Sequence, residues 1–147
     1  MNYEPKFSWH PDSGTAICVL KDNKGRTFVG EAMCHPNDLD MVSERTGCEL
    51  AFRRAKLEYL RTIRDAELKP ALRALKHLYG CMTHSTNFNA NSYEARTIRK
   101  HIHQITFDLT TIKEEIAYEY QGITDYIKGK DRIYNKIRSR NTEDKVD

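Results

Sequence analysis

The sequence predicts an α+β fold: a small N-terminal antiparallel β-sheet in meander order, then a long kinked helix and a second long helix. Three strand-like segments separated by turn residues begin the chain. Apolar residues then recur at helical spacing on either side of an uncharged loop. The length of 147 residues suits a single domain. We expect five parts: the meander at 1–36, the kinked helix at 37–80, a loop at 81–92, a helix with a heptad seam at 93–140, and a tail at 141–147.

Turn residues delimit the strands of the predicted meander. Pro11–Gly14 and Asp22–Gly25 each end in glycine, and Gly25 can adopt the positive φ of a tight turn. Gly30, inside the third strand, indicates either a bulge or the close approach of another backbone or a ligand. A three-stranded sheet with one packed face needs a covering helix. The predicted strands are Lys6–His10, Thr15–Lys21 and Arg26–Cys34.

The first helix is predicted over Glu44–Tyr79, with Gly80 ending it. Its apolar residues recur at steps of three, four and seven. Pro70 lies inside this pattern, where it removes a hydrogen bond and clashes one turn back, so we expect a kink near Ala66. The apolar positions are Leu50, Leu57, Leu60, Ile63, Leu68, Leu72, Leu75 and Tyr79.

The second helix is predicted from Tyr93 to about Ser139 and carries a sustained heptad seam. Glu119 and Lys130 interrupt the seam, and Gly122 weakens the helix locally. Three short strands cannot cover a seam of this length. We therefore expect it to pack on the first helix at one end and on another subunit at the other. The apolar positions are Ile98, Ile102, Ile105, Leu109, Ile112, Ile116, Ile123, Tyr126, Ile133 and Ile137.

Charge is distributed unevenly along a chain whose formal net charge is +3. Lys128–Arg140 carries +5 and residues 141–147 carry −2, so the remaining body is near neutral. A neutral body argues against a general nucleic-acid-coating protein, and we expect no nucleic-acid partner for it. The sequence has no apolar run of about 18 residues, so we expect no membrane partner and a cytoplasmic location.

The sequence carries no pattern for catalysis or for metal binding. It lacks a phosphate-binding loop, a dinucleotide fingerprint, and the zinc-protease and hydrolase motifs. Cys34-His35 has no second ligand pair at metal spacing. We therefore expect no enzyme, no cofactor and no metal, and free thiols at Cys18, Cys34, Cys48 and Cys81.

The loop at 81–92 is the strongest candidate for ligand recognition. It places Phe88 among asparagines, just before two arginines on the first turns of the second helix. An aromatic face can stack on a base, an amide can read a base edge, and a guanidinium can bind phosphate. The alternative is a capped surface loop that Phe88 anchors. The predicted ligand-binding residues are Phe88, Asn89, Asn91, Arg96 and Arg99, with Arg26, Arg53 and Arg54 as further cations.

The segment Phe28–Ala55, FVGEAMCHPNDLDMVSERTGCELAFRRA, resembles the strand-to-helix segment of small phage proteins in the type 1 Thoeris anti-defence family. Looser agreement extends over Gly14–Tyr79, and the predicted architecture is similar to that of the family. The resemblance implies a non-enzymatic sponge, which binds the cyclic ADP-ribose isomer made by host TIR-domain proteins and releases it unaltered on denaturation. Some members also bind cyclic oligonucleotides at separate sites on hexamers.

The resemblance therefore implies a small nucleotide signal as ligand, a homo-oligomer (dimer or hexamer) and a location in the host cytoplasm. The ligand-binding residues named above are chosen by their chemistry near the motif and are not transferred from the family. A different function remains open, an oligomeric coiled-coil module that binds a protein or nucleic acid through its basic C-terminal helix. Binding that falls steeply with salt would favour this second function.

Overall fold

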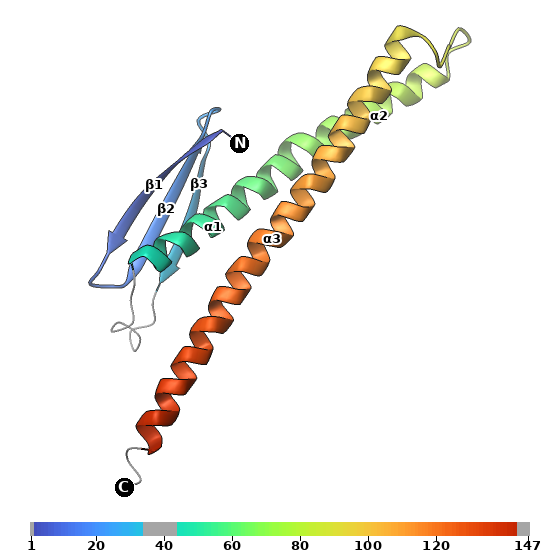
Figure 1. Cartoon of the computed structure of the whole chain (residues 1–147). Helices are drawn as coiled ribbons and strands as arrows, with labels where there is room; N and C mark the ends of the chain where they lie inside the picture. Colours follow the sequence, from blue (N-terminus) through green and yellow to red (C-terminus); the bar gives the residue numbers. More distant parts are fainter. Residues whose placement is uncertain (1, 34–43, 144–147) are drawn as a thin grey trace. The chain divides into compact units, whose positions relative to one another are not determined.

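The computed structural model confirms the α+β arrangement of an N-terminal antiparallel sheet followed by long helices (Figure 1). It describes residues 2–33 and 44–143, with the side chains of the last helix described up to residue 129. In chain order the elements are β1 (Tyr3–His10), β2 (Thr15–Asp22), β3 (Thr27–Met33), α1 (Glu44–Thr62), a π-helical segment η2 (Ile63–Leu68), α2 (Lys69–Thr83) and α3 (Tyr93–Glu143).

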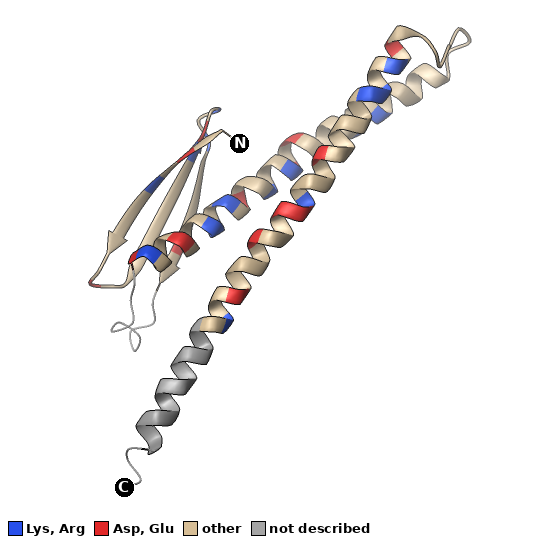
Figure 2. Ribbon diagram, in the orientation of Figure 1, with Lys and Arg blue, Asp and Glu red and all other residues tan. Residues whose placement is uncertain are grey.

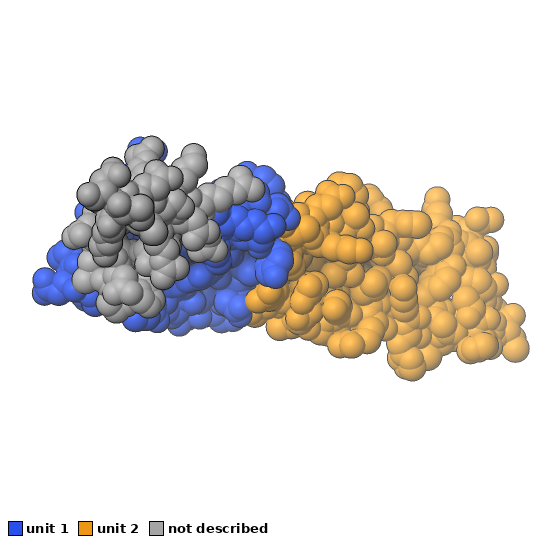
Figure 3. Space-filling model, turned by 90° about the horizontal axis from the view of Figure 1, so that it is seen from below, with its two compact units in different colours: residues 1–58, 118–147 blue, residues 59–117 orange. Residues whose placement is uncertain are grey.

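The chain divides into two compact units (Figure 3). Unit 1 combines residues 1–58 with residues 118–147, and unit 2 is formed by residues 59–117. Unit 1 therefore contains the sheet, most of α1 and the second half of α3. Unit 2 contains the end of α1, η2, α2 and the first half of α3.

The sheet of unit 1 is an antiparallel meander in the order β1-β2-β3. Gly14 and Gly25 adopt φ of 65° and 80° in the two connecting turns, a conformation that glycine reaches without the penalty of a Cβ. Cys18 of the central strand β2 lies opposite Phe7 of β1 on one side and opposite Gly30 of β3 on the other. Pairing continues without interruption through Gly30, so the bulge considered for this position is absent.

Close approach of a helix accounts for Gly30. A Cβ at this position would overlap the carbonyl oxygen of Ala51 on α1 and would lie 2.5 Å from the amide nitrogen of Ala55. The backbone approach predicted for Gly30 is therefore confirmed. Gly47, one turn earlier on α1, similarly leaves room for Ala16 and Trp9.

Small and medium-sized side chains build the core of unit 1 around this contact. Alternate residues of β2 and β3 are buried, as expected for strands with one covered face. The buried apolar residues of unit 1 are Ala16, Cys18, Leu20, Phe28, Ala32, Leu50, Ala51, Ala55, Leu57 and Ile123.

The first long helix is interrupted where the sequence predicts. The π-helical segment Ile63–Leu68 contains Ala66 and ends two residues before Pro70. The amide of Lys69 donates to the carbonyl of Arg64, five residues back, which is the π-helical pattern. Because Pro70 has no amide hydrogen and its ring crowds the preceding turn, a widened turn at this place relieves the conflict.

The predicted end of this helix at Gly80 is wrong, because α2 continues to Thr83. Among the described residues, a Cβ built at Gly80 would meet no atom within 4 Å beyond its chain neighbours and its own helix backbone, and the Thr83 hydroxyl donates to the Gly80 carbonyl at 2.8 Å. The next helix begins at Tyr93, as predicted. The side chains of the predicted seam positions Lys130, Ile133 and Ile137 lie outside those described.

Unit 2 leaves its apolar seam incompletely covered. The six seam positions from Ile98 to Ile116 are all half-buried, and neither η2 nor α2 contributes a fully buried residue. Among the described residues of unit 2, Tyr59, Leu60 and Ala95 form the buried apolar set. Two packed helices bury only the face that each turns toward the other. Part of the apolar surface of both helices therefore stays accessible to solvent.

Candidate functional site

Hydrogen bonds within the loop at 84–92 fix its conformation. The Asn89 side-chain oxygen accepts from the Asn91 amide at 2.9 Å, which closes a local turn. The Ser92 hydroxyl accepts from the Ala95 amide at 3.2 Å and so caps the N-terminus of α3. Asn89 and Asn91 are both exposed. The loop therefore presents its amide side chains to solvent from a turn that one of them stabilises.

An aromatic and cationic cluster lies beside this loop in unit 2. The Phe88 and Tyr79 rings meet edge to face, with centroids 6.0 Å apart and planes at 88°. Arg99 places its guanidinium carbon 5.8 Å from the Tyr79 centroid and donates from Nη1 to the Tyr79 hydroxyl at 2.8 Å. Tyr79 thus joins two of the predicted ligand-binding residues, Phe88 and Arg99, into one cluster.

The sequence pattern placed Tyr79 among the apolar positions of the first helix and did not indicate it as a site residue. The available signal was its position at the end of that pattern, two residues before the candidate loop. Arg96, on the first turns of α3, is exposed, and its side chain has no hydrogen bond or ion pair to any described residue. The cluster therefore has one guanidinium engaged with an aromatic ring and a second one open to solvent.

Arg26 of unit 1 has a structural partner. Its Nε donates to Asp22 Oδ2 at 2.8 Å, while the amides of Arg26 and Lys24 donate to Asp22 Oδ1. Burial alone would raise the pKa of Asp22, but the Arg26 side chain and these amides outweigh it and hold that pKa below its usual value. Arg26 thus stabilises the β2–β3 turn.

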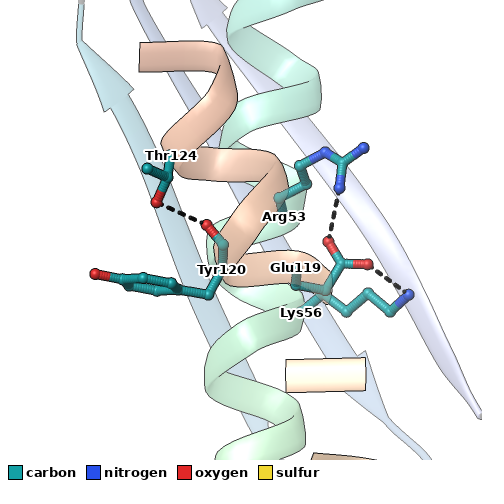
Figure 4. A network of polar contacts seen from close by, with 5 residues as sticks. All are labelled: Arg53, Lys56, Glu119, Tyr120 and Thr124. Atoms are coloured by element: carbon teal, nitrogen blue, oxygen red, sulfur yellow. Dashed lines mark hydrogen bonds and ion pairs between the residues drawn. The ribbon is translucent and has the colours of Figure 1, made fainter. Parts of the chain in front are cut away.

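Arg53 and Arg54 also bond within unit 1. Arg53 Nη1 and Lys56 Nζ donate to opposite oxygens of the buried Glu119 carboxylate, at 3.2 and 3.0 Å (Figure 4). The Arg53 guanidinium also lies 5.8 Å from the centroid of the Tyr118 ring. Arg54 donates from Nη1 to the Glu31 carbonyl on β3. Both side chains therefore have partners within their own unit.

Cys18 and Cys48 have the character of structural thiols, whereas Cys81 is exposed. Burial, with a smaller contribution from Cys48, raises the pKa of the Cys18 thiol to about 11, so it remains protonated. Burial and then the charge of Glu44 raise the pKa of Cys48 as well. Within residues 2–33 and 44–129, no group of three His, Cys, Asp or Glu is placed to hold a metal ion. The Cys34-His35 pair lies outside the described residues.

Comparison with known proteins identifies no relative: the chain matches no protein-family model, no curated protein and no solved structure. In the part of the chain that the structure describes, no helix is both long and apolar enough to span a membrane.

Proposed function

We propose that the protein is a non-enzymatic phage sponge, which binds and sequesters a cyclic ADP-ribose isomer and thereby blocks a Thoeris-type host defence. The sequence resemblance over Phe28–Ala55 suggests this function. The observation that carries it on the structural side is the cluster of Phe88, Tyr79 and Arg99 beside the exposed Arg96. Aromatic rings and guanidinium groups in one place suit a ligand that combines a base with a pyrophosphate.

The proposed contacts divide between base and phosphate. Phe88 stacks on the adenine, and the exposed amides of Asn89 and Asn91 bond to polar edges of the ligand. Arg96 binds the pyrophosphate near the positive end of the α3 helix dipole. Arg99 supports the site through its bond to Tyr79. Because Arg26, Arg53 and Arg54 bond within unit 1, the proposed contacts centre on unit 2.

The proposal includes a homo-oligomer formed through the heptad seam. The half-buried residues from Ile98 to Ile116 supply an apolar surface that a second copy can cover. A dimer is the smallest assembly that achieves this, and a hexamer follows if the dimers associate further. Ligand capture without turnover needs no catalytic group.

Titration calorimetry with cyclic ADP-ribose isomers tests the proposal. Phe88→Ala removes a stacking face worth about 1–3 kcal/mol. Arg96→Ala removes charged hydrogen bonds worth about 1.5–3 kcal/mol. Each variant should therefore weaken binding by about ten- to a hundredfold.

Arg73→Ala, which removes an exposed arginine of α2 outside the proposed site, is the matched control and should bind as the unmodified chain does. Both site variants should keep their fold and oligomeric state. Absence of heat with every isomer, or equal losses in Arg96→Ala and Arg73→Ala, would refute the assignment.

A further inference from the structure

One face of α3 carries basic side chains flanked by two aromatic ones. Tyr93 and Phe107 stand at its two ends, and Arg96, Lys100 and His103 come between them. The steps of 3, 4, 3 and 4 residues place all five on the same face of the helix. We call these five residues the aromatic–basic stripe.

All five side chains of the aromatic–basic stripe are exposed, whereas the seam of the same helix is half-buried. Tyr93 keeps 73% and Phe107 keeps 66% of its surface accessible. Among the described residues, the stripe side chains have no hydrogen bond, ion pair or ring contact. Tyr93 and Phe107 therefore offer accessible ring faces on the same side of the helix as Arg96 and Lys100.

The segment that leads into the stripe and carries most of it has a positive net charge in the sequence, although the whole body of the chain is near neutral. Lys69–Gln104, which covers α2, the loop and the start of α3, holds six Lys or Arg residues against the single acid Glu94 (Figure 2). Glu94 follows Tyr93 directly and so points about 100° away round the helix. A local positive field of this kind attracts an extended anion.

We infer that the aromatic–basic stripe binds single-stranded nucleic acid. Bases stack on Tyr93 and Phe107, while Arg96 and Lys100 contact the phosphates between them. Successive stripe residues rise by about 4.5–6 Å along the axis, and the stripe spans about 21 Å, enough for a few nucleotides of an extended strand. A duplex fits less well because its bases are already stacked on one another.

Fluorescence anisotropy with labelled oligothymidylate and oligouridylate of about ten nucleotides tests this inference. The unmodified chain should bind at low salt, with affinity falling as salt rises. Phe107→Ala and Tyr93→Ala should each weaken binding by about tenfold. Lys100→Ala should weaken binding and lower the slope of log affinity against log salt by about 0.7.

Matched controls come from another face of the same helix. Lys113 and Tyr120 each lie 13 residues beyond a stripe residue, Lys100 and Phe107 respectively, and so about 140° round the helix. Lys113→Ala and Tyr120→Ala should bind as the unmodified chain does. No binding to either oligonucleotide at low salt, or equal losses in the stripe variants and their controls, would overturn the inference.

Light scattering separates the stripe from a self-association surface. Phe107→Ala should leave the mass of the assembly unchanged; a drop in that mass would show that a second copy, not nucleic acid, covers the stripe. Calorimetry with cyclic ADP-ribose isomers should be unaffected by Lys100→Ala and Phe107→Ala. A variant can therefore lose binding of the oligonucleotide while it keeps binding of the cyclic ADP-ribose isomer. The two proposals can thus fail independently of one another.

Discussion

Lys56 on α1 donates from Nζ to Glu119 Oε1 on α3 at 3.0 Å, and the Glu119 residue retains 4% of its surface accessible. Arg53 satisfies the other carboxylate oxygen. A buried carboxylate without such partners would be strongly unfavourable. Glu119, one of the two charged positions that interrupt the heptad seam, thus joins α3 to α1 by charge within unit 1.

Glu119→Gln should lower the free energy of unfolding by about 1–3 kcal/mol, because Gln carries no charge, keeps one acceptor oxygen and turns an NH2 group toward one of the two cations. This loss of stability is smaller than that expected for a fully buried ion pair, because the side chains of Arg53 and Lys56 remain 35% and 20% exposed. Urea denaturation provides the measurement. Glu114→Gln, at an exposed position of the same helix, should change little. Equal effects of the two substitutions would contradict this role.

Gly30→Ala should destabilise the protein by about 1–3 kcal/mol, because the new Cβ meets backbone atoms of Ala51 and Ala55 that cannot rotate away. Gly80→Ala, within α2 and free of close neighbours, should instead stabilise it by about 0.5–1 kcal/mol. Thermal unfolding measures both. A melting temperature for Gly30→Ala at or above that of the unmodified chain would rule out close packing of α1 on β3.

Asp22 should make stability depend on pH in the acid range. Because its folded-state pKa is depressed, its contribution is complete above the ordinary value of 3.8 and is lost as the pH falls toward the lower folded-state pKa. Urea midpoints between about pH 5 and pH 3 should therefore fall less steeply for Asp22→Asn than for the unmodified chain. Asp12→Asn, in the exposed first turn, should follow the unmodified chain.

Ile105→Asp and Ile112→Asp should each break the proposed homo-oligomer, because each places a charge in the apolar seam. Light scattering should then give the mass of a single chain. Ala117→Asp, at an exposed position of α3, is the control and should leave the assembly intact. A single-chain mass for the unmodified protein would end the oligomer proposal.

Local sequence signals were sufficient for most of the fold. Turn glycines delimited the strands, and Pro70 located the irregular turn at Ile63–Leu68. Gly80 gave a wrong prediction of the helix end. A glycine ends a helix when it adopts the left-handed conformation there, whereas this helix continues through Gly80 to Thr83.

The roles of the arginines depend on contacts that no local pattern contains. Arg53 and Glu119 lie 66 positions apart in the chain. From the sequence, Gly122 indicated only a locally weakened helix. In the structure, the absence of a side chain at Gly122 leaves the space that the Arg53 guanidinium occupies. Tyr79 likewise joins Phe88 and Arg99 through a turn that brings α2 and α3 together within unit 2.

The most direct test of sequestration is to follow the ligand through binding and release. The purified protein is saturated with a cyclic ADP-ribose isomer, freed of unbound ligand by gel filtration and then denatured by heat. The account predicts that the ligand co-elutes with the protein and is recovered with its mass unchanged, in amounts that Arg96→Ala reduces. A linear or cleaved product in the released fraction, or a protein fraction that carries no ligand, would contradict it.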